Sequence, residues 1–440
     1  MTSLSPAPLV ILATFGTAGD LEPFLLMARG LRARGHRVCV LTSRDHEARL
    51  LESGLPHRLY GSVAKVDAVL DDPELWDERK GLGVVWRGVL EGFEEVVDLM
   101  TALASDEPCV ALCHPFMLPA ADVARSHRPR LRAVGAWLAP SNLRTIHDPM
   151  MLGSRRIPSW VPPAWRGALW RFVDRHWIDG VLLPGLDAVR AAHALAPVDR
   201  FFEHLGRVCD ASVGLFPSWF APRVPDWPTP FVEAGFPLAA ASDSAELPAE
   251  IERFLADGPP PVVVTFGSGM RHAHATFESA RRALLALGRR GVFVSRHRLQ
   301  VPAVLSSGIL WTPFASFDRL LPRAAAIVHH GGIGTTAQAL RAGLPQLVVA
   351  SGFDQFDNGE RLHLLGVADA LPARRASVRA LRRRLGRLLR STSVRVACEA
   401  AARRFEQPVS AGVSDAFVDR VAGALAMAAS GASSCRVPMG

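Results

Sequence analysis

The most informative part of the sequence is the string HHGGIGTT at residues 329–336. It follows an apolar run, Ala324 to Val328, that is expected to form a strand, and it leads into an expected helix from Thr336 to Arg341. A glycine-rich turn between a strand and a helix offers backbone N–H groups and the positive end of the helix to a phosphate. A histidine at the strand end adds a donor that can carry positive charge beside an anion. The string predicts a phosphate site, although its glycines alone would fit any strand-to-helix turn.

A second group of polar residues follows the next expected strand, Gln346 to Ala350. Asp354 and Gln355 come after this strand, and Asn358 follows them. A carboxylate and an amide suit the hydroxyl groups of a sugar. A diphosphate site beside a site for a polyhydroxy ring is what a nucleotide-sugar requires, so the two groups together predict that ligand.

The elements that position these groups alternate between strand and helix in both halves of the chain, which is typical of parallel sheets covered on both faces. A chain of 440 residues is too long for one core and suits two domains. The predicted fold class is α/β, with two Rossmann-like doubly wound domains that face a cleft and bind ligands at the carboxyl ends of their strands. We place the domains at residues 1–238 and 259–408, a linker rich in Ala, Ser and Pro at 239–258, and a last helix and tail at 409–440.

The first half opens with an expected strand, Leu9 to Phe15, and a second glycine turn, GTAGD at residues 16–20. A helix to Arg34 follows, and we expect Asp20 to cap it and Pro23 to lie in its first turn. The turn does not have the spacing Gly-x-Gly-x-x-Gly, and no acidic residue ends the next strand. Nicotinamide binding is therefore the weaker interpretation.

The composition excludes several classes of protein. No apolar run approaches the ~18–20 residues of a membrane span, and Met1 to Pro8 has no basic residue, so we expect a cytoplasmic protein without a secretory signal. The six cysteines lack the spacing of metal ligands, and no Asp-x-Asp pair occurs. We therefore expect no bound metal and no cofactor.

The net charge of +8 comes from arginine, because Lys65 and Lys80 are the only lysines. The densest patch, Arg374 to Arg390, has leucines on one helical face. It indicates an amphipathic surface helix first, and a peripheral contact with the inner membrane second. Nucleic-acid binding is not expected, since no aromatic residues are interleaved with the charge.

The phosphate string and several further motifs resemble family 1 glycosyltransferases, and within them the rhamnosyltransferase B chains of rhamnolipid biosynthesis. The further motifs are GTAGDxxPF at 16–24, DPELWD at 72–77, GVVW at 83–86, LFPSWFAP at 215–222, DWP at 226–228, GFPL at 235–238 and DQFDN at 354–358. The resemblance implies the glycosyltransferase B fold, in which the final helix, here expected at Val413 to Leu425, crosses back to the N-terminal domain. It also implies an inverting, metal-independent transfer of a hexose, rhamnose from dTDP-L-rhamnose, to a hydroxyalkanoyloxy-alkanoate.

The resemblance makes Asp20 the base that takes the proton of the acceptor hydroxyl. A carboxylate at a strand end can accept that proton, but an ordinary aspartate, with a pKa of about 3.9, is a weak base unless burial raises the value. From the residues alone, a base and a helix cap are equally good interpretations of Asp20. His114, at the end of an apolar run bounded by Cys109 and Cys113, is the next candidate base.

For the donor diphosphate, the resemblance assigns His330, with Gly332, Gly334 and Thr335 forming the phosphate turn and Ser268 as a second phosphate donor. Asp354 and Gln355 would bind the sugar.

The nucleoside would stack on Trp311, for which a buried structural role is the alternative. Family members that hold both ribose hydroxyls carry glutamate at the position of Gln338. An amide holds a diol less firmly, so dTDP-sugars fit as well as UDP-sugars.

The acceptor is predicted to be hydrophobic because Trp160, Trp165, Trp170 and Trp177 crowd one stretch. Each could pack in the core, but together they could line a cleft for an aliphatic chain. A UDP-sugar-dependent transferase acting on a sterol, another lipid or a polyketide remains an alternative. A different sugar-nucleotide enzyme, such as an epimerase, and a non-catalytic partner of the same fold are the others.

Overall fold

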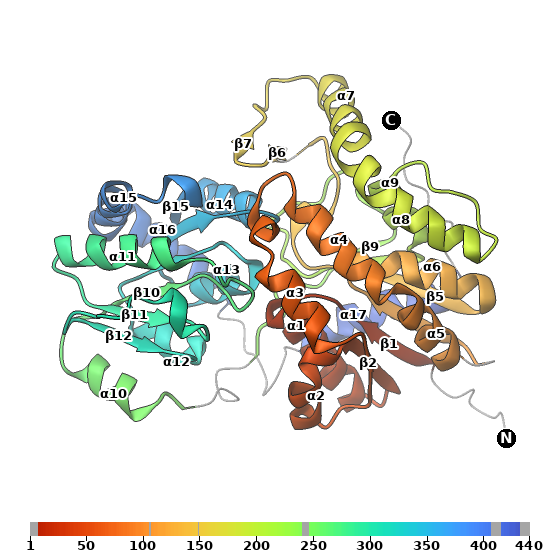
Figure 1. Cartoon of the computed structure of the whole chain (residues 1–440), viewed down its shortest axis with the longest axis horizontal. Coiled ribbons are helices and arrows are strands. Elements are labelled where there is room, and N and C mark those ends of the chain that lie inside the picture. The colour runs from red at the N-terminus through yellow and green to blue at the C-terminus, as the bar shows by residue number, and fades with distance from the viewer. Residues whose placement is uncertain (1–7, 105–106, 148, 240–245, 406–414, 432–440) are drawn as a thin grey trace.

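The computed structural model describes residues 8–104, 107–147, 149–239, 246–405 and 415–431. Two parallel sheets, each with helices on both faces, form two domains that lie side by side (Figure 1). The strands of both sheets are short apolar runs whose residues are almost all buried, as expected of parallel strands covered from both sides. The predicted fold class is confirmed.

The N-terminal sheet has the strand order β3-β2-β1-β4-β5-β8-β9, and every neighbouring pair is parallel. Its strands are β1 (Leu9–Ala13), β2 (Val38–Ser43), β3 (His57–Tyr60), β4 (Cys109–Cys113), β5 (Leu131–Trp137), β8 (Ala211–Gly214) and β9 (Phe231–Glu233). The helices of this half are α1 (Ala18–Ala33), α2 (Glu47–Ser53), α3 (Val63–Asp71), α4 (Gly81–Glu91), α5 (Phe93–Leu103), α6 (Leu118–His127), α7 (Pro163–Val173), α8 (Asp179–Ala192) and α9 (Phe201–Val208). A small antiparallel hairpin, β6 (Met151–Leu152) with β7 (Arg155–Arg156), precedes α7.

The C-terminal sheet has the order β12-β11-β10-β13-β14-β15 and is also parallel. Its strands are β10 (Val262–Thr265), β11 (Gly291–Val294), β12 (Ile309–Thr312), β13 (Ala326–His329), β14 (Gln346–Ala350) and β15 (Ala368–Pro372). The helices of this half are α10 (Ala249–Ala256), α11 (His274–Ala286), α12 (Phe317–Leu320), α13 (Ile333–Arg341), α14 (Gln355–Leu364), α15 (Val378–Arg390) and α16 (Thr392–Ala402).

The range 239–258, expected to be a linker, contains the helix α10. Leu247 and Ile251 pack with Val263 and Ile327 of the C-terminal sheet, so this part of the range belongs to the C-terminal core. The alanine and proline content suggested a linker, but Ile251 of the helix and Leu247 before it are buried, and Phe254 and Leu255 of the helix pack against the same cluster. Residues 240–245 of that range lie outside the described residues.

The last described helix, α17 (Asp415–Ala429), packs on the N-terminal sheet and on α1. Phe417, Val418 and Val421 are buried in the N-terminal core. A Cβ at Gly30 would lie 2.4 Å from Val418, so glycine at that position allows α1 and α17 to approach closely. The expected ranges 409–414 and 432–440, including the start of the helix predicted from Val413, lie outside the described residues.

Helix α1 begins differently from the prediction. Its N-cap is Thr17, and Asp20 stands at the third helical position, where its side chain accepts a hydrogen bond from the Thr17 N–H in a capping box. Pro23 lies inside the helix rather than in its first turn. The correction matters because Asp20 faces back over the glycine turn.

Helix α15 buries Leu381, Leu385 and Leu388 against the C-terminal core, and Arg384 and Arg387 pair with Asp369. It is the amphipathic surface helix that the leucine spacing indicates. Across the described ranges, no helix is both long and apolar enough to span a bilayer.

The two domains contact each other through ion pairs and aromatic pairs, among them those beside the cavity. Arg271 of the C-terminal domain binds Asp67 and Asp71 at the end of α3. The rings of Trp76 and Phe353 meet edge to face with centroids 5.6 Å apart. These contacts border the cavity between the domains.

Candidate active site

A cavity of about 370 Å³ lies between the domains and is lined by residues of both. Asp20 and His114 reach it from the N-terminal domain, and His330 and Asp354 reach it from the C-terminal domain. A larger cavity of about 970 Å³ adjoins it. Ser268, Gly334 and Thr335 line both, so the turn that is predicted to bind phosphate, called the phosphate turn below, lies where the two cavities meet.

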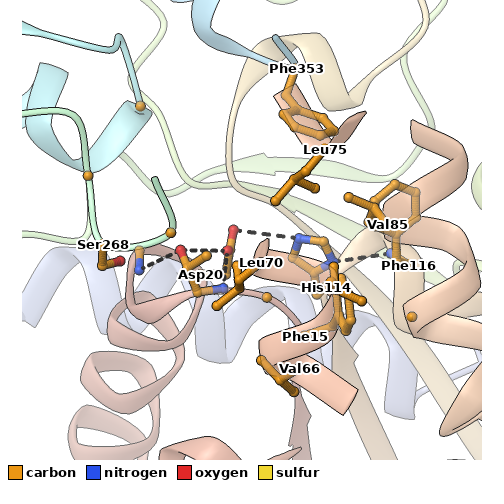
Figure 2. A pocket seen from close by; sticks show the side chains of 18 of the residues that line it. Phe15, Asp20, Val66, Leu70, Leu75, Val85, His114, Phe116, Ser268 and Phe353 are labelled. Carbon is orange, nitrogen blue, oxygen red and sulfur yellow. Dashed lines mark hydrogen bonds and ion pairs between the residues drawn. The ribbon is translucent and has the colours of Figure 1, made fainter. Parts of the chain in front are cut away.

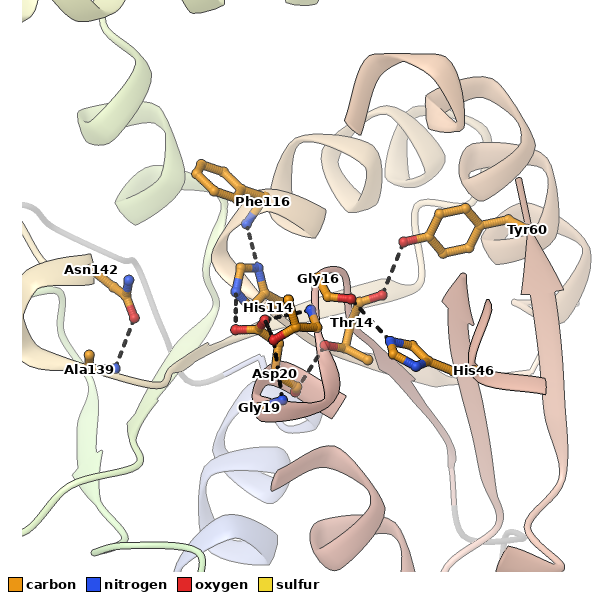
Figure 3. A network of polar contacts seen from close by, with 11 residues as sticks. Thr14, Gly16, Gly19, Asp20, His46, Tyr60, His114, Phe116, Ala139 and Asn142 are labelled. Carbon is orange, nitrogen blue, oxygen red and sulfur yellow. Dashed lines mark hydrogen bonds and ion pairs between the residues drawn. The ribbon is translucent and has the colours of Figure 1, made fainter. Parts of the chain in front are cut away.

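Asp20 is fixed by the turn that precedes its helix. Its Oδ2 accepts hydrogen bonds from the Thr17 N–H at 2.8 Å and the Thr17 hydroxyl at 3.3 Å (Figure 3). Gly16 has φ +113°, and a Cβ there would lie 2.3 Å from Asp20 Oδ2, so only glycine suits this turn. The second oxygen, Oδ1, remains for the cavity.

Burial raises the pKa of Asp20 to about 6, although the two bonds from Thr17 lower it in part. The side chain is still 34% exposed, because it opens onto the cavity. At neutral pH the carboxylate is ionised, and it is a stronger base than an ordinary aspartate. Burial therefore gives Asp20 the raised pKa that a base needs, which the sequence alone could not predict.

His114 faces Asp20 from the end of β4. Its Nδ1 accepts a hydrogen bond from the Phe116 N–H at 3.2 Å, so the ring proton must be on Nε2. Nε2 lies 4.0 Å from Asp20 Oδ1 (Figures 2 and 3). Burial lowers the pKa of His114 to about 3, which keeps the ring neutral. A histidine whose Nε2 carries the proton cannot accept another there, so the geometry makes His114 a neighbour of Asp20 rather than a substitute base.

The phosphate turn joins β13 to α13 as predicted. Gly332 is the N-cap of α13, and Gly331 has φ +96°. A Cβ at Gly331 would also lie 3.0 Å from the backbone oxygen of Gln355. The positive φ and the close contact both require glycine at position 331. The contact also shows that the turn lies close to the start of α14.

His330 lies between two glycines. A Cβ at Gly332 would be 2.4 Å from its Nε2, and one at Gly267 would be 2.9 Å from the same atom. Its Nδ1 is buried and has no hydrogen-bond partner in the described part of the chain. Burial lowers the pKa of His330 to about 4, so the ring is neutral until an anion stabilises its charged form. His329, by contrast, bonds Gln346 and the Gly331 N–H and serves the fold.

Asp354 and Gln355 both line the smaller cavity, at the start of α14. Burial, and then the charge of Asp20, raises the pKa of Asp354 to about 7, while Asn358 donates to it at 2.7 Å. The side-chain oxygen Oε1 of Gln355 accepts hydrogen bonds from the backbone N–H groups of Ser351 and Gly352. Gln355 therefore braces its own loop, and only its amide N–H groups remain to donate to a ligand.

The larger cavity contains Gln338, whose Oε1 is buried without a hydrogen-bond partner among the described residues. Trp311 is not among the residues that line either cavity. Its indole N–H donates to the Ser295 carbonyl at 3.0 Å, and its ring packs on the C-terminal core. The structure therefore favours a structural role for Trp311 over the predicted stacking on the nucleoside.

Three residues that the sequence analysis missed line the larger cavity: Arg296, Pro313 and Phe314. They lie within two residues of the ends of β11 and β12, and the carboxyl ends of parallel strands are where ligands bind. This positional signal was present in the sequence. Trp311 was predicted to bind the nucleoside instead, because its side chain is aromatic.

The prediction for the acceptor tryptophans also needs correction. Trp160, Trp165 and Trp177 are 80%, 73% and 56% exposed, and none of them lines the smaller cavity. Its apolar lining comes instead mainly from α3, α4 and the loops beside them (Figure 2). The apolar residues of the lining include Phe15, Val66, Val69, Leu70, Leu75, Trp76, Val85, Phe116 and Phe353. The spacing of Val66, Val69 and Leu70 marks one helical face and could have indicated this wall.

Comparison with known proteins agrees with this geometry. Residues 10–95 match the glycosyltransferase family 28 N-terminal domain, and residues 294–419 match the C-terminal domain of erythromycin biosynthesis protein CIII-like proteins. Glycosyltransferase GtfE of Amycolatopsis orientalis is 31% identical over 82% of this chain and 85% of its own length. The chain therefore belongs to the same family of glycosyltransferases as GtfE.

This glycosyltransferase is also 29% identical to the O-mycaminosyltylonolide 6-deoxyallosyltransferase of Streptomyces fradiae, over 93% of this chain and 96% of the relative. Among solved structures, the spinosyn rhamnosyltransferase SpnG complexed with thymidine diphosphate superposes with a TM-score of 0.64 at 17% identity. That superposition covers 94% of this glycosyltransferase and 100% of the other chain, and it supports the two-domain fold.

Proposed function

We propose that this glycosyltransferase moves a hexose from a nucleoside diphosphate to a hydroxyl group of an apolar acceptor, with inversion and without a metal. The observation that carries the proposal is the smaller cavity, where Asp20 and His330 reach one space from opposite domains. A base on one side and an anion site on the other is the arrangement that an in-line displacement needs.

In the proposed reaction, the acceptor hydroxyl gives its proton to Asp20 Oδ1. The hydroxyl oxygen bonds to the anomeric carbon, and the bond between that carbon and the diphosphate oxygen breaks with both electrons leaving on the diphosphate. The acceptor attacks from the side of Asp20, opposite to the phosphate turn, which inverts the anomeric centre. The raised pKa of Asp20 supports its role, because a stronger base takes more of the proton at the transition state.

The leaving diphosphate would be held by His330, Ser268, Thr335 and the N-terminus of α13 at Gly334. Burial makes these donors effective, since a developing charge is stabilised more strongly where water is excluded. The unpartnered Nδ1 and the lowered pKa of His330 fit a ring that becomes charged when an anion arrives. Within the described residues, no group of three or more His, Cys, Asp and Glu side chains is placed to hold a metal ion.

The sugar would lie beside Asp354, with the amide of Gln355 donating to a second hydroxyl. The nucleoside would occupy the larger cavity, with the Oε1 of Gln338 accepting from a ribose hydroxyl and Phe314 beside the base. An amide at position 338, and the thymidine diphosphate bound to the similar SpnG structure, support dTDP over UDP.

Two acceptor classes follow from different observations. The resemblance to rhamnolipid enzymes supports rhamnose and a hydroxyalkanoyloxy-alkanoate, and the branched and aromatic wall of the cavity suits its aliphatic chains. The names of the relatives instead support an antibiotic or polyketide aglycone. Both share one requirement, an apolar body that bears a free hydroxyl.

The proposal can be tested with purified protein and a panel of nucleotide-sugars, first by thermal shift. A true donor at 100 times its dissociation constant should stabilise the fold by about 2.7 kcal/mol. Each binding donor is then paired with a hydroxyalkanoyloxy-alkanoate, a polyketide aglycone and a sterol, and the products are identified by mass spectrometry and anomeric coupling. A product that retains the donor's anomeric configuration, or no product from any pair, would count against the mechanism. Conversion of the donor to another nucleotide-sugar without acceptor would identify an epimerase.

A further inference from the structure

The tryptophans that do not line the cavity form a surface of their own. Four large aromatic side chains, on α7 and the segments beside it, are more than half exposed: Trp160 at 80%, Trp165 at 73%, Phe172 at 51% and Trp177 at 56%. Three arginines of the same stretch, Arg155, Arg171 and Arg175, are also exposed. We call these seven residues the α7 surface. In Figure 1, α7 and the β6–β7 hairpin stand at the top edge of the molecule, beyond both sheets.

The helix geometry gathers the aromatic residues into one stripe. Trp165 and Phe172 are seven residues apart, which places them on the same helical face. A π-helical turn over Asp174–Ile178 then adds one residue, so Trp177 returns to that face. The rings of Phe172 and Trp177 meet edge to face at 5.6 Å. Without the π turn, Trp177 would be rotated away from the stripe.

A buried arginine holds the neighbouring loop rigidly. Arg166 lies on the inner face of α7, and its guanidinium donates to the carbonyls of Ile146, His147, Pro158, Ser159 and Val161. The loop that carries Trp160 is thus tied to the helix that carries Trp165. Trp160 is presented to solvent from a braced position.

The charge of the surface has one sign. Between residues 149 and 178 the single acidic residue is Asp174, and it is buried against Arg144. Arg155, Arg171 and Arg175 make no ion pair with any described residue, whereas Arg156 is neutralised by Glu360. A rigid apolar stripe flanked by unpaired arginines is complementary to a surface in which a layer of negative charge covers an apolar layer.

We propose that the α7 surface docks this protein on an anionic phospholipid bilayer. Tryptophan rings partition to the boundary between lipid headgroups and acyl chains, and arginines near that boundary bind anionic headgroups. A short amphipathic helix with this pattern lies in the plane of the membrane surface. The α15 helix is a poorer candidate, because its leucines are buried in the core and two of its arginines are paired with Asp369.

The α7 surface also borders the acceptor side of the N-terminal domain. The stripe continues to Val181 of α8, which is close enough to α4 that a Cβ at Gly83 would be 3.1 Å from it. Val85 of the same helix lines the smaller cavity. Docking at this surface would allow an apolar acceptor to pass from the bilayer to the cavity, and that step rests on the proposed function. Binding of the α7 surface to the bilayer does not depend on the proposed function.

The test is co-sedimentation of the full chain with vesicles of phosphatidylcholine alone and of phosphatidylcholine with phosphatidylglycerol. We expect binding to the anionic vesicles, weakened by salt. Trp165→Ala/Trp177→Ala should reduce the partition coefficient about tenfold or more, and Arg171→Gln/Arg175→Gln should reduce it by about fivefold per arginine.

Two matched controls should bind as the wild type does. Arg382→Gln/Arg383→Gln removes the same charge from the exposed face of α15, and Leu299→Ala removes an exposed apolar side chain of the C-terminal domain. Melting temperatures and donor binding should be unchanged in all four variants, which excludes misfolding as the cause.

Failure of the wild type to sediment with anionic vesicles would overturn the proposal, as would equal losses in the α15 control. A change of molecular mass in solution on Trp165→Ala/Trp177→Ala, without vesicle binding by the wild type, would show that the surface binds another protein chain instead. Because donor binding is measured separately, failure here leaves the transferase proposal standing.

Discussion

Replacing Asp20 by asparagine removes a charge and a proton acceptor while leaving the turn around it intact. The asparagine oxygen can take the place of Oδ2 and accept the Thr17 N–H that Asp20 accepts at 2.8 Å. The capping box of α1 therefore survives in large part. The Gly16 turn is also kept, since the two side chains have the same shape. Any large effect of Asp20→Asn must come from the carboxylate itself.

The expected effect is a loss of turnover by about 10²- to 10⁴-fold, which corresponds to roughly 2.7–5.4 kcal/mol of activation free energy. The wild type should lose kcat/KM as the pH falls below about 6, because the pKa of Asp20 is raised to about 6. The variant should have no such acid limb. Both are measured as initial rates across a pH series with the donor and acceptor that the panel identifies.

Stability provides the complementary measurement. A carboxyl group whose pKa is raised by folding stabilises the native state only while it is protonated, so its contribution is lost as the pH rises from the ordinary value through about 6. At pH 7 the charged Asp20 opposes folding, and asparagine does not. Asp20→Asn should therefore melt at the same temperature as the wild type or higher.

Asp77→Asn is the matched control. Asp77 also accepts backbone N–H groups, those of Arg79 and Lys80, but it is exposed and does not line the cavity. It should keep wild-type turnover. The base assignment is refuted if Asp20→Asn turns over within a few-fold of the wild type, in which case Asp20 serves only the start of α1.

Four further outcomes follow from the site. Activity should survive EDTA, because in the proposed mechanism His330 and the start of α13 hold the diphosphate without a metal; loss on chelation that magnesium or manganese restores would show a metal site. His330→Ala should lower kcat/KM about 10²- to 10³-fold, and a change below threefold would place the diphosphate elsewhere. Gln355→Glu keeps the oxygen that braces the loop but removes the amide N–H groups, so donor KM should rise while free dTDP binding, measured by calorimetry, stays unchanged; an equal loss for both ligands would put Gln355 at the nucleotide. His114→Asn can still cap the Phe116 N–H but removes the Nε2 proton beside Asp20, so the acid limb should move to higher pH, and an unmoved limb would make His114 purely structural.

The local arrangement of residues that are neighbours in the sequence could be predicted, while their roles in binding remain predictions. The phosphate turn is one segment, and its glycines, His330 and the start of α13 lie together because the chain passes directly from strand to helix. Likewise the alternation of apolar runs was enough to predict two parallel sheets. Residues that are close together in the sequence determine these features, so they could be predicted without knowledge of the packing.

The features that depend on packing were not predicted. Trp311 was assigned to the nucleoside because it is aromatic, but whether a strand-end aromatic faces a cavity or the core depends on the layers around it. The exposed tryptophans were assigned to the acceptor for the same reason. The pKa of Asp20 could not be predicted either, since it arises from burial by residues far apart in the sequence.

The two carboxyl groups of the smaller cavity, Asp20 and Asp354, both have raised pKa values. Burial is the main cause of both shifts, which raise the pKa of Asp20 to about 6 and that of Asp354 to about 7, and the charge of Asp20 adds to the shift of Asp354. Because the two carboxyl groups interact, their protons are taken up in two steps that belong to the pair. A protonated Asp354 can donate to a sugar hydroxyl as well as accept from one. When the pair carries one proton, the cavity holds one carboxylate and one carboxylic acid, which is the combination that the proposed base at Asp20 and the proposed sugar contact at Asp354 need.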